Sequence, residues 1–213
     1  MSPLSHITEA ALVKLREDIR PYMGARRYAH TLSVAEEAVC LANIYLPKNI
    51  AEIQAAALLH DVTKEWSFAE QIAYCRARGI SLTAEEYASP KVIHAITAPT
   101  FIKENFPTFA EARILSAIRT HTVGGPRMPL FSKILYLADY IEKTRTFPDC
   151  VALRRMFWEF ELPRTKRAQI RHLDRVILAS YDMTIRSLLE EGAPISSATL
   201  RARNELLSKN LSL

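Results

Sequence analysis

The segment Ala55-Ala56-Ala57-Leu58-Leu59-His60-Asp61 is an apolar run that ends in an imidazole and a carboxylate. Two adjacent side chains of this kind cannot share one face of a helix, but at a helix end both can reach around a single metal ion. Burying either group is costly unless a partner satisfies it. Lys64 follows within one turn and adds a positive charge. The segment therefore predicts a buried helix that ends at a metal site.

Four more residues of the same two types are candidate ligands. They are His30, His94, His121 and Asp139. Each histidine alone is compatible with an ordinary buried side chain, and His121 is also compatible with a helix C-cap. Asp139 is harder to explain in this way, because aspartate is unfavourable inside a helix and segment 134–141 contains no cation. Imidazole and carboxylate together suit Fe, Mn, Zn, Ni or Co better than magnesium.

Length and composition indicate one globular domain. The chain has 213 residues, of which 49% are hydrophobic, and this is ample for a core. It contains no apolar stretch long enough to span a membrane, and its first residues lack the basic start and apolar stretch of a signal peptide. A cytoplasmic protein is therefore expected. Its three cysteines lie too far apart for a disulfide framework or a zinc knuckle, so reduced thiols are expected.

The charge of the chain allows two kinds of partner. The net charge is +5 and the pI is about 9.2. The basic residues are scattered, with no run of five or more, so their pattern does not single out a nucleic-acid-binding protein. A phosphate-rich small-molecule substrate explains a modest positive excess equally well.

Residue usage favours helices throughout. Only five glycines occur, alternating β-branched runs are absent, and Ala, Leu, Glu and Arg dominate. Hydrophobic periodicity predicts an all-α bundle of about nine or ten helices, over 7–20, 27–45, 49–61, 66–78, 90–105, 109–121, 130–142, 150–160, 165–189 and 199–208. Asn49 and Glu52 are expected to form a capping box, and Pro99 is expected to kink the fifth helix. His6 and His172 have no ligand-like context and are expected at the surface.

Four strings of the sequence resemble the YqeK-type family of HD-domain proteins. They are Arg27-Tyr-Ala-His-Thr31, Ala57-Leu-Leu-His-Asp61 with Lys64, Ala117-Ile-Arg-Thr-His-Thr-Val-Gly124, and Met128-Pro-Leu-Phe-Ser-Lys-Ile-Leu-Tyr-Leu-Ala-Asp-Tyr-Ile-Glu142 with Arg145. Together with the C-terminal segment 195–204, the similarity covers about residues 27 to 204. The resemblance implies an HD-domain helical bundle, a single domain over 1–213. Its core would lie at about 27–145, with C-terminal helices at 150–208 packed on it.

The resemblance also implies an activity and a cofactor. That family comprises symmetrical bis(5'-nucleosyl)-tetraphosphatases, hydrolases of acid anhydrides that cleave diadenosine tetraphosphate into two ADP. The resemblance implies that a metal-bound hydroxide attacks the substrate. It also implies a cofactor of one or two divalent transition-metal ions, with iron as the first choice and Mn, Co, Ni or Zn as alternatives. One ion would be held by His30, His60, Asp61 and Asp139, and Asp61 would bridge to a second ion held by His94 and His121. The chain departs from the family at Ala95, where glycine is usual, and at Lys143, where proline is common.

Catalytic and substrate-binding roles follow from the same resemblance. The catalytic residues would be His60, Asp61 and Lys64, and the substrate would contact Lys64, His94, His121, Thr122, Gly124, Arg145, Thr199 and Asn204. A lysine beside the metal would neutralise a phosphoryl oxygen, and an arginine there could bind phosphate through two parallel hydrogen bonds. The ordinary alternatives are a solvated Lys64 and a surface ion pair between Arg145 and Glu142.

Two other functions fit the same set of ligands. One is another HD-superfamily phosphohydrolase or phosphodiesterase that acts on nucleotides, dNTPs or cyclic dinucleotides. The other is a non-catalytic nucleotide-binding HD protein, but such a protein would be expected to have lost ligands, and all six positions are filled. The expected partner is a small dinucleoside polyphosphate. Neither a membrane nor a nucleic acid is expected, and the sequence leaves the oligomeric state open.

Overall fold

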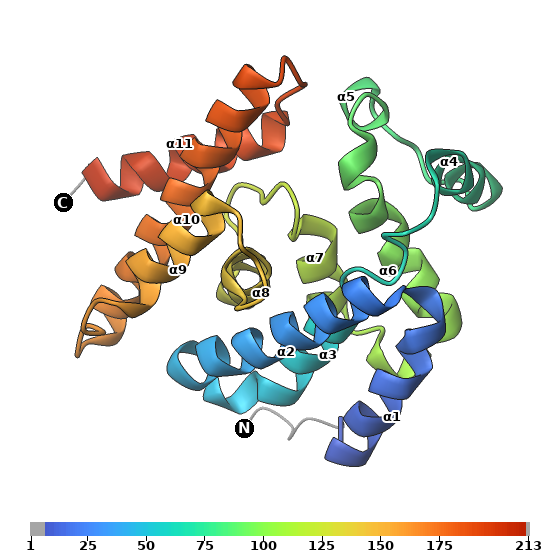
Figure 1. The fold of residues 1–213 in the computed structure, drawn as a ribbon, viewed down its shortest axis with the longest axis horizontal. Helices are drawn as coiled ribbons and strands as arrows, with labels where there is room; N and C mark the ends of the chain where they lie inside the picture. The colour runs from blue at the N-terminus through green and yellow to red at the C-terminus, as the bar shows by residue number, and fades with distance from the viewer. Residues whose placement is uncertain (1–6, 212–213) are drawn as a thin grey trace.

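A computed structural model describes residues 7–211 of the chain, so the prediction about His6 lies outside the described residues. Within that range every regular element is a helix, and the predicted all-α class is confirmed (Figure 1). The α-helices are α1 (Glu9–Ile19), α2 (Ala25–Tyr45), α3 (Ile50–Leu59), α4 (Phe68–Ala77), α5 (Ala84–Tyr87), α6 (His94–Asn105), α7 (Ala112–Thr120), α8 (Leu130–Ile141), α9 (Pro148–Trp158), α10 (Lys166–Glu190) and α11 (Ser197–Leu211). Short 3-10 turns lie at Arg20–Tyr22, Pro47–Asn49, Pro90–Val92 and Pro107–Phe109.

The second half of α3, residues 55–59, is apolar on all sides and lies inside the bundle. Residues 55–59 have no exposed surface, as expected for a helix without a polar face. Burying a leucine side chain stabilises a fold by about 1.5–3 kcal/mol, so Leu58 and Leu59 hold the end of α3 in the interior. His60 and Asp61 follow directly and are buried with it, at 0% and 3% exposure.

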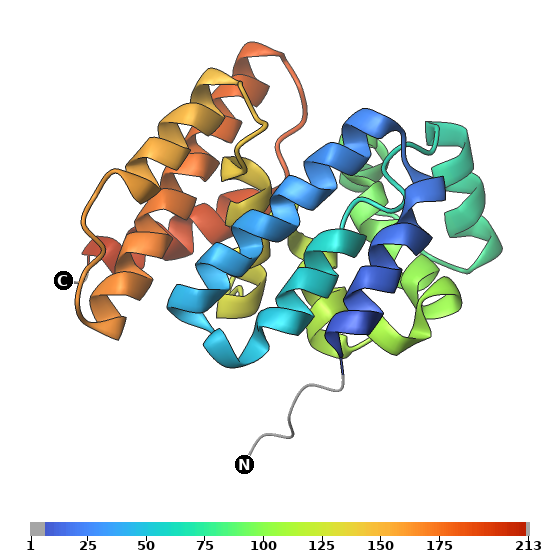
Figure 2. The same ribbon diagram turned by 60° about the horizontal axis from the view of Figure 1, so that its bottom comes forward.

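The centre of the bundle consists of α2, α3, α7 and α8. α3 packs against the other three, and α2 packs against α8. On one side of this centre lie α9, α10 and α11, and on the other side lie α4, α5 and α6 (Figure 2). One cluster of buried side chains extends from Ile7 to Leu206 and includes Val34, Leu135 and Ile177. The central helices are therefore covered by elements from both ends of the sequence.

α5 is the helix that the sequence did not predict. It has four residues, too few to show the 3.6-residue hydrophobic period. A capping box sets its start: Thr83 Oγ1 accepts from Glu86 N at 3.1 Å, and Glu86 Oε2 accepts from Thr83 N at 2.9 Å. These two bonds satisfy backbone donors that a helix start would otherwise leave unpaired.

The capping box predicted for Asn49 and Glu52 is wrong. Asn49 is the N-cap residue of α3, but its side chain accepts no backbone hydrogen bond. Its Nδ2 donates instead to Glu52 Oε1 at 3.3 Å. Asn49 also ends a 3-10 turn, and its φ of −125° and ψ of 24° differ from the extended conformation that a capping side chain needs.

His172 is buried, so the prediction of a surface position is wrong. Its exposure is 8%, and its Nε2 lies 3.1 Å from the carbonyl oxygen of Phe157. The two rings also pack together, with centroids 5.1 Å apart. α9 packs against this face of α10. The sequence around His172 is polar, so it does not predict that another helix packs there.

α6 begins later than predicted and continues through Pro99. Residues 90–92 form a 3-10 turn, and the α-helix begins at His94 and extends to Asn105. Proline has no N–H, so one hydrogen bond within the helix is missing. The late start places a candidate ligand in the first turn of α6.

The remaining expectations from composition concern thiols and membranes. Cys40 is exposed, Cys75 and Cys150 are buried, and all three are free thiols. Among the helices of the described range, none combines the length and the apolar character of a membrane span.

Candidate metal centre

The six predicted ligands converge at one place in the bundle although five helices supply them. His30 lies on α2, His60 and Asp61 directly follow α3, His94 begins α6, His121 directly follows α7, and Asp139 lies on α8. All six are buried, with exposures of 9% or less. Facing helices that each contribute inward-pointing ligands are the usual way in which bundles build metal sites.

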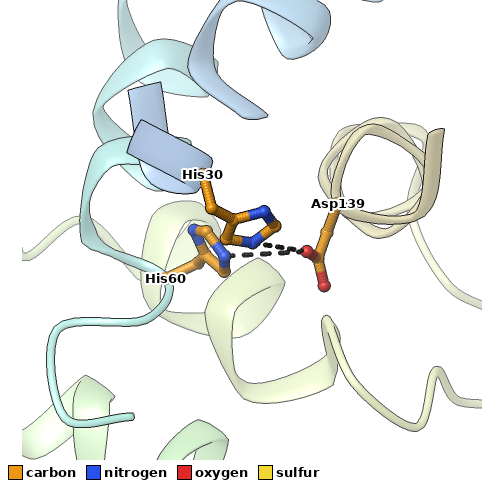
Figure 3. Close-up of side chains that lie close together, drawn as sticks. All are labelled: His30, His60 and Asp139. Carbon is orange, nitrogen blue, oxygen red and sulfur yellow. Dashed lines mark ion pairs between the residues drawn. The ribbon is translucent and has the colours of Figure 1, made fainter. Parts of the chain in front are cut away.

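His30, His60 and Asp139 form the first group of possible ligands. Nε2 of His30 lies 3.1 Å from Oδ1 of Asp139, and Nε2 of His60 lies 3.9 Å from the same oxygen. Figure 3 shows both imidazole rings facing the carboxylate of Asp139. The three ligand atoms all lie within 4.8 Å of one another, close enough to surround one ion.

Asp61 connects this group to two further histidines. Its Oδ2 lies 3.4 Å from Nε2 of His60 and 3.8 Å from Nε2 of His30. Its Oδ1 lies 3.2 Å from Nε2 of His94 and 3.6 Å from Nε2 of His121. His60, Asp61 and His121 form a second group with ligand atoms within 4.8 Å of one another. The two oxygens of one carboxylate thus face two sets of imidazole nitrogens.

Hydrogen bonds to the backbone orient two of the imidazole rings. Nδ1 of His60 lies 2.6 Å from the carbonyl oxygen of Ala57, and Nδ1 of His121 lies 2.7 Å from that of Ile118. A carbonyl oxygen only accepts, so Nδ1 carries a proton and Nε2 is the ring nitrogen that faces the cluster. Nε2 of His60 is buried and has no hydrogen-bond partner among the described residues. The imidazole nitrogens and carboxylate oxygens of this cluster are therefore suitable ligands for a divalent transition metal.

The carboxylate of Glu142 anchors His30, although the sequence alone does not identify it as part of the cluster. Oε1 of Glu142 lies 3.0 Å from Nδ1 of His30, and the Glu142 side chain is fully buried. Thr144 donates to it twice, from N to Oε2 at 2.6 Å and from Oγ1 to Oε1 at 2.8 Å. The surface ion pair considered between Glu142 and Arg145 is therefore wrong. Its spacing of three residues from Asp139, which places both carboxylates on one helix face, is a sequence signal that agrees with this position but does not establish it.

Arg145 supplies the cation that the sequence around Asp139 lacks. Its Nη2 lies 2.5 Å from Oδ1 of Asp139, and its Nε donates to the main-chain carbonyl of the same residue at 2.5 Å. Burial alone would raise the pKa of the Asp139 carboxyl, but Arg145 and the neighbouring His30 and His60 hold that pKa well below its usual value. Asp139 is therefore ionised at neutral pH, as a metal ligand must be.

Lys64 is half-buried beside the histidines. Its Nζ donates to the carbonyl oxygen of Lys91 at 3.0 Å and lies 3.3 Å from Nδ1 of His94. Burial lowers the pKa of Lys64, and the charges of Asp61 and Asp139 oppose that shift. Burial also lowers the pKa of His94 to about 4, so the imidazole is neutral at pH 7, which is the protonation state that a metal-binding histidine needs.

Two of the predicted substrate-binding residues lie on the loop that follows His121. Thr122 Oγ1 is buried, and among the described residues it has no hydrogen-bond partner. Gly124 has a φ of +67°, and a Cβ atom at this position would lie 2.0 Å from the hydroxyl oxygen of Tyr181. Both the backbone conformation and the packing against Tyr181 therefore require glycine here.

Two more of these residues lie on α11. Thr199 is buried, and its Oγ1 donates to the carbonyl oxygen of Val123 at 2.7 Å. Asn204 is exposed, and its Oδ1 accepts a hydrogen bond from Nη1 of Arg203 at 3.3 Å. Thr199 thus holds α11 against the loop that follows His121, whereas Asn204 lies at the surface.

Sequence comparison finds relatives that are similar to this chain over most of its length. Residues 27–144 match the HD domain family. A protein of Halalkalibacterium halodurans named "Bis(5'-nucleosyl)-tetraphosphatase, symmetrical" is 32% identical over 189 residues, which cover 89% of this chain and 93% of that protein. A Bacillus subtilis protein of the same name is 27% identical over 190 residues, which cover 89% of this chain and 94% of that protein.

A solved structure from Clostridium acetobutylicum shares the fold. It is described as a predicted HD superfamily hydrolase involved in NAD metabolism, and its TM-score with this structure is 0.78 at 30% sequence identity. The match covers 92% of this chain and 97% of that one. The family resemblance seen in the sequence is thereby confirmed. The chain belongs to the HD domain family and is, within it, a relative of the symmetrical bis(5'-nucleosyl)-tetraphosphatases.

Proposed function

We propose that this protein is a metal-dependent phosphohydrolase that cleaves diadenosine tetraphosphate symmetrically into two ADP. The observation that carries the proposal is the position of Asp61, whose two oxygens face two sets of buried imidazole nitrogens. Relatives named for this activity are similar over 89% of the chain. The metal-ligand side chains and the family relationship thus both support metal-dependent hydrolysis of a phosphate anhydride.

The proposal assigns the six ligands to two ions. His30, His60, Asp61 and Asp139 would hold the first ion, and Asp61 would bridge to a second ion held by His94 and His121. Iron is our first choice, and Mn, Co, Ni and Zn fit the same mixture of imidazole and carboxylate donors. When bound, such ions lower the pKa of water and neutralise phosphoryl oxygens.

Cations of the chain itself would position the polyphosphate. Nζ of Lys64 would donate to a phosphoryl oxygen beside the centre, which its distance of 3.3 Å from a ring nitrogen of His94 supports. Arg145 uses Nε and Nη2 for its contacts with Asp139, which leaves Nη1 for phosphate. The Thr122 hydroxyl can donate one further hydrogen bond.

The symmetrical reaction divides the substrate at its central bridge. The oxygen of a water molecule forms a bond to the β-phosphorus of one half, and the bond from that phosphorus to the central bridging oxygen breaks. The bridging oxygen leaves with the other half, so both products are ADP. Because ADP is a stable anionic leaving group, positive charge from Lys64 and Arg145 can stabilise it without a dedicated general acid.

A panel of substrates and metals tests the proposal. The purified protein is stripped with a chelator, reloaded with Fe(II), Mn(II), Co(II) or Mg(II), and incubated with diadenosine tetraphosphate, dNTPs or cyclic dinucleotides. Anion-exchange chromatography should show ADP as the sole product of diadenosine tetraphosphate, with a transition metal as the best activator. AMP together with ATP would contradict symmetrical cleavage, and preferred turnover of dNTPs or cyclic dinucleotides would favour another phosphohydrolase of the superfamily.

A further inference from the structure

A buried amide side chain connects α4 to two segments of the candidate metal centre. Gln71 lies on α4, which packs against α6, and its exposure is 4%. Its Nε2 donates to the carbonyl oxygen of Thr63 at 2.7 Å, and its Oε1 accepts from Oγ1 of Thr97 at 2.7 Å. Because a carbonyl oxygen only accepts, the contact with Thr63 fixes which end of the amide is the nitrogen. One side chain thus joins the segment after Asp61 to the first turn of α6.

Two threonine hydroxyls extend this contact to a histidine of the centre. Thr63 and Thr97 are both fully buried, and their Oγ1 atoms lie 2.9 Å apart. The carbonyl oxygen of His94 lies 3.1 Å from Oγ1 of Thr63 and 3.2 Å from Oγ1 of Thr97. Gln71, Thr63 and Thr97 therefore form a buried polar network, the Gln71 network, that contacts the backbone of His94. A buried network with its hydrogen bonds made holds the segments that it joins rigidly.

The start of α6 depends on contacts from outside the helix. Its N-cap residue is Ile93, whose apolar side chain cannot accept a hydrogen bond from the helix backbone. Pro99 has no N–H, so the carbonyl oxygen of Ala95, one turn earlier, lacks its usual helical donor. The position of His94, the first residue of α6, therefore depends on packing and on the Gln71 network.

The Gln71 network also holds the segment that carries Lys64. Lys64 follows Thr63 directly, and its Nζ lies 3.3 Å from Nδ1 of His94. That ammonium also donates at 3.0 Å to the carbonyl oxygen of Lys91, in the 3-10 turn before α6. The other ring nitrogen of His94, Nε2, lies 3.2 Å from Oδ1 of Asp61. A shift of the Thr63 segment against α6 would therefore change both contacts of the imidazole.

We propose that Gln71 is a positioning residue of this centre, which acts through Thr63 and Thr97 on His94. Its amide holds the segment after Asp61 and the start of α6 at the separation at which His94 can serve as a ligand of the second ion. The partners of metal ligands change metal affinity by about 10- to 100-fold. The inference rests on the second ion of the proposed function, but not on the identity of the substrate.

The experiment compares variants that keep or remove the hydrogen bonds of the network. Gln71→Met keeps the approximate size of the side chain and removes both amide contacts. Thr97→Val removes one hydroxyl, and Thr97→Ser keeps it. Ser180→Ala is the matched control, because Ser180 is fully buried on α10, a helix that supplies no ligand, and its Oγ donates to the carbonyl oxygen of Ile177 at 2.7 Å.

Metal binding is the main measurement. Mn(II) is titrated into each chelator-stripped protein by calorimetry, and elemental analysis gives the metal content. Urea denaturation gives the free energy of unfolding, and circular dichroism checks that each variant folds. If Gln71→Met does not fold, the comparison of Thr97→Val with Thr97→Ser decides the inference.

The expected losses concern one ion only. Gln71→Met and Thr97→Val should weaken binding of the ion that His94→Ala loses by about 10- to 100-fold, and the affinity for the other ion should stay the same. Thr97→Ser should bind both ions as the wild type does. Ser180→Ala should unfold at a lower urea concentration but should keep both affinities. Because the amide acts through His94, adding Gln71→Met to His94→Ala should not weaken binding of the remaining ion.

Three results would overturn the role of Gln71. Wild-type affinity for both ions in Gln71→Met would show that the network does not position a ligand. Equal losses of affinity in Gln71→Met and Ser180→Ala would show a general effect of lower stability. A single ion in the wild type would remove the site on which the inference depends. The proposed function fails separately: if the wild type binds two ions but releases no ADP from diadenosine tetraphosphate, the metal titrations still decide the role of Gln71.

Discussion

Oε1 of Glu142 lies 3.0 Å from Nδ1 of His30 at a place that solvent does not reach. Burial alone would raise the pKa of Glu142, but the hydrogen bonds from His30 and Thr144 help to lower it to about 2, so the group is a carboxylate at neutral pH. A carboxylate on Nδ1 fixes the ring orientation and turns Nε2 towards Asp139, and partners of this kind tune the affinity of histidine ligands for metal.

Replacing Glu142 should therefore weaken metal binding without removing a ligand. Glu142→Gln keeps the shape of the side chain but loses the charge that supports His30, and metal affinity should fall by about 10- to 100-fold. Competition with a fluorescent chelator measures this affinity. Glu36→Gln is the matched control, since Glu36 lies on the exposed face of α2 and pairs with Lys143. Equal affinities in the two variants would show that the Glu142 contact does not tune the centre.

Asp61 and His94 should differ in how many ions their loss removes. Because the two oxygens of Asp61 face both groups of histidines, Asp61→Asn should abolish metal content and activity together. His94→Ala should lower the metal content to about half, since His94 lies beside Oδ1 of Asp61, on the side of the second ion only. Elemental analysis of both purified variants provides the measurement. Near wild-type activity in Asp61→Asn would refute the bridging assignment.

Removing the metal should destabilise the folded protein. A ligand that binds only the native state stabilises it by about 2.7 kcal/mol at a concentration of 100 times its Kd, and six buried polar side chains lose that partner when a chelator takes the metal. Scanning calorimetry should show a lower Tm after chelation and recovery after reloading. The Asp61→Asn variant serves as the control, because its Tm should not respond to metal. An identical Tm for the wild type with and without chelator would contradict a metal bound by the native fold.

Gly124 should be far less tolerant of substitution than Gly192. Both have a positive φ, of +67° and +63°, so alanine costs about 1–2 kcal/mol of backbone strain at either position. At Gly124 the new Cβ would also lie 2.0 Å from the Tyr181 hydroxyl oxygen, whereas at Gly192 nothing lies within 4 Å. Gly124→Ala should therefore lose about 1–3 kcal/mol more than Gly192→Ala. Urea denaturation compares the two free energies of unfolding, and equal losses would show that Tyr181 does not restrict this loop.

The sequence alone determined what is buried and which side chains are available for chemistry. The run 55–59 is apolar on every face, so it can only lie inside, and His60 and Asp61 must follow it there. Most helices follow in the same way, because the 3.6-residue period is a local property of the chain. α5 could not be predicted in this way, because its four residues contain barely one 3.6-residue helical period.

The tertiary structure decided which buried groups meet. Hydrophobic periodicity shows which face of a helix is buried but not which other helix covers it. The sequence around His172 therefore predicts a surface position, whereas in the structure α9 packs over this part of α10. The contact between His30 and Glu142 spans 112 residues of sequence, and that between Arg27 and Asp61 spans 34. Both depend on how α2 packs against α8 and against the end of α3. The sequence therefore determines which types of ligand are present, whereas helix packing determines which partners each of them contacts. A side chain reaches only a few ångströms, so the chain must fold before side chains from distant segments can meet.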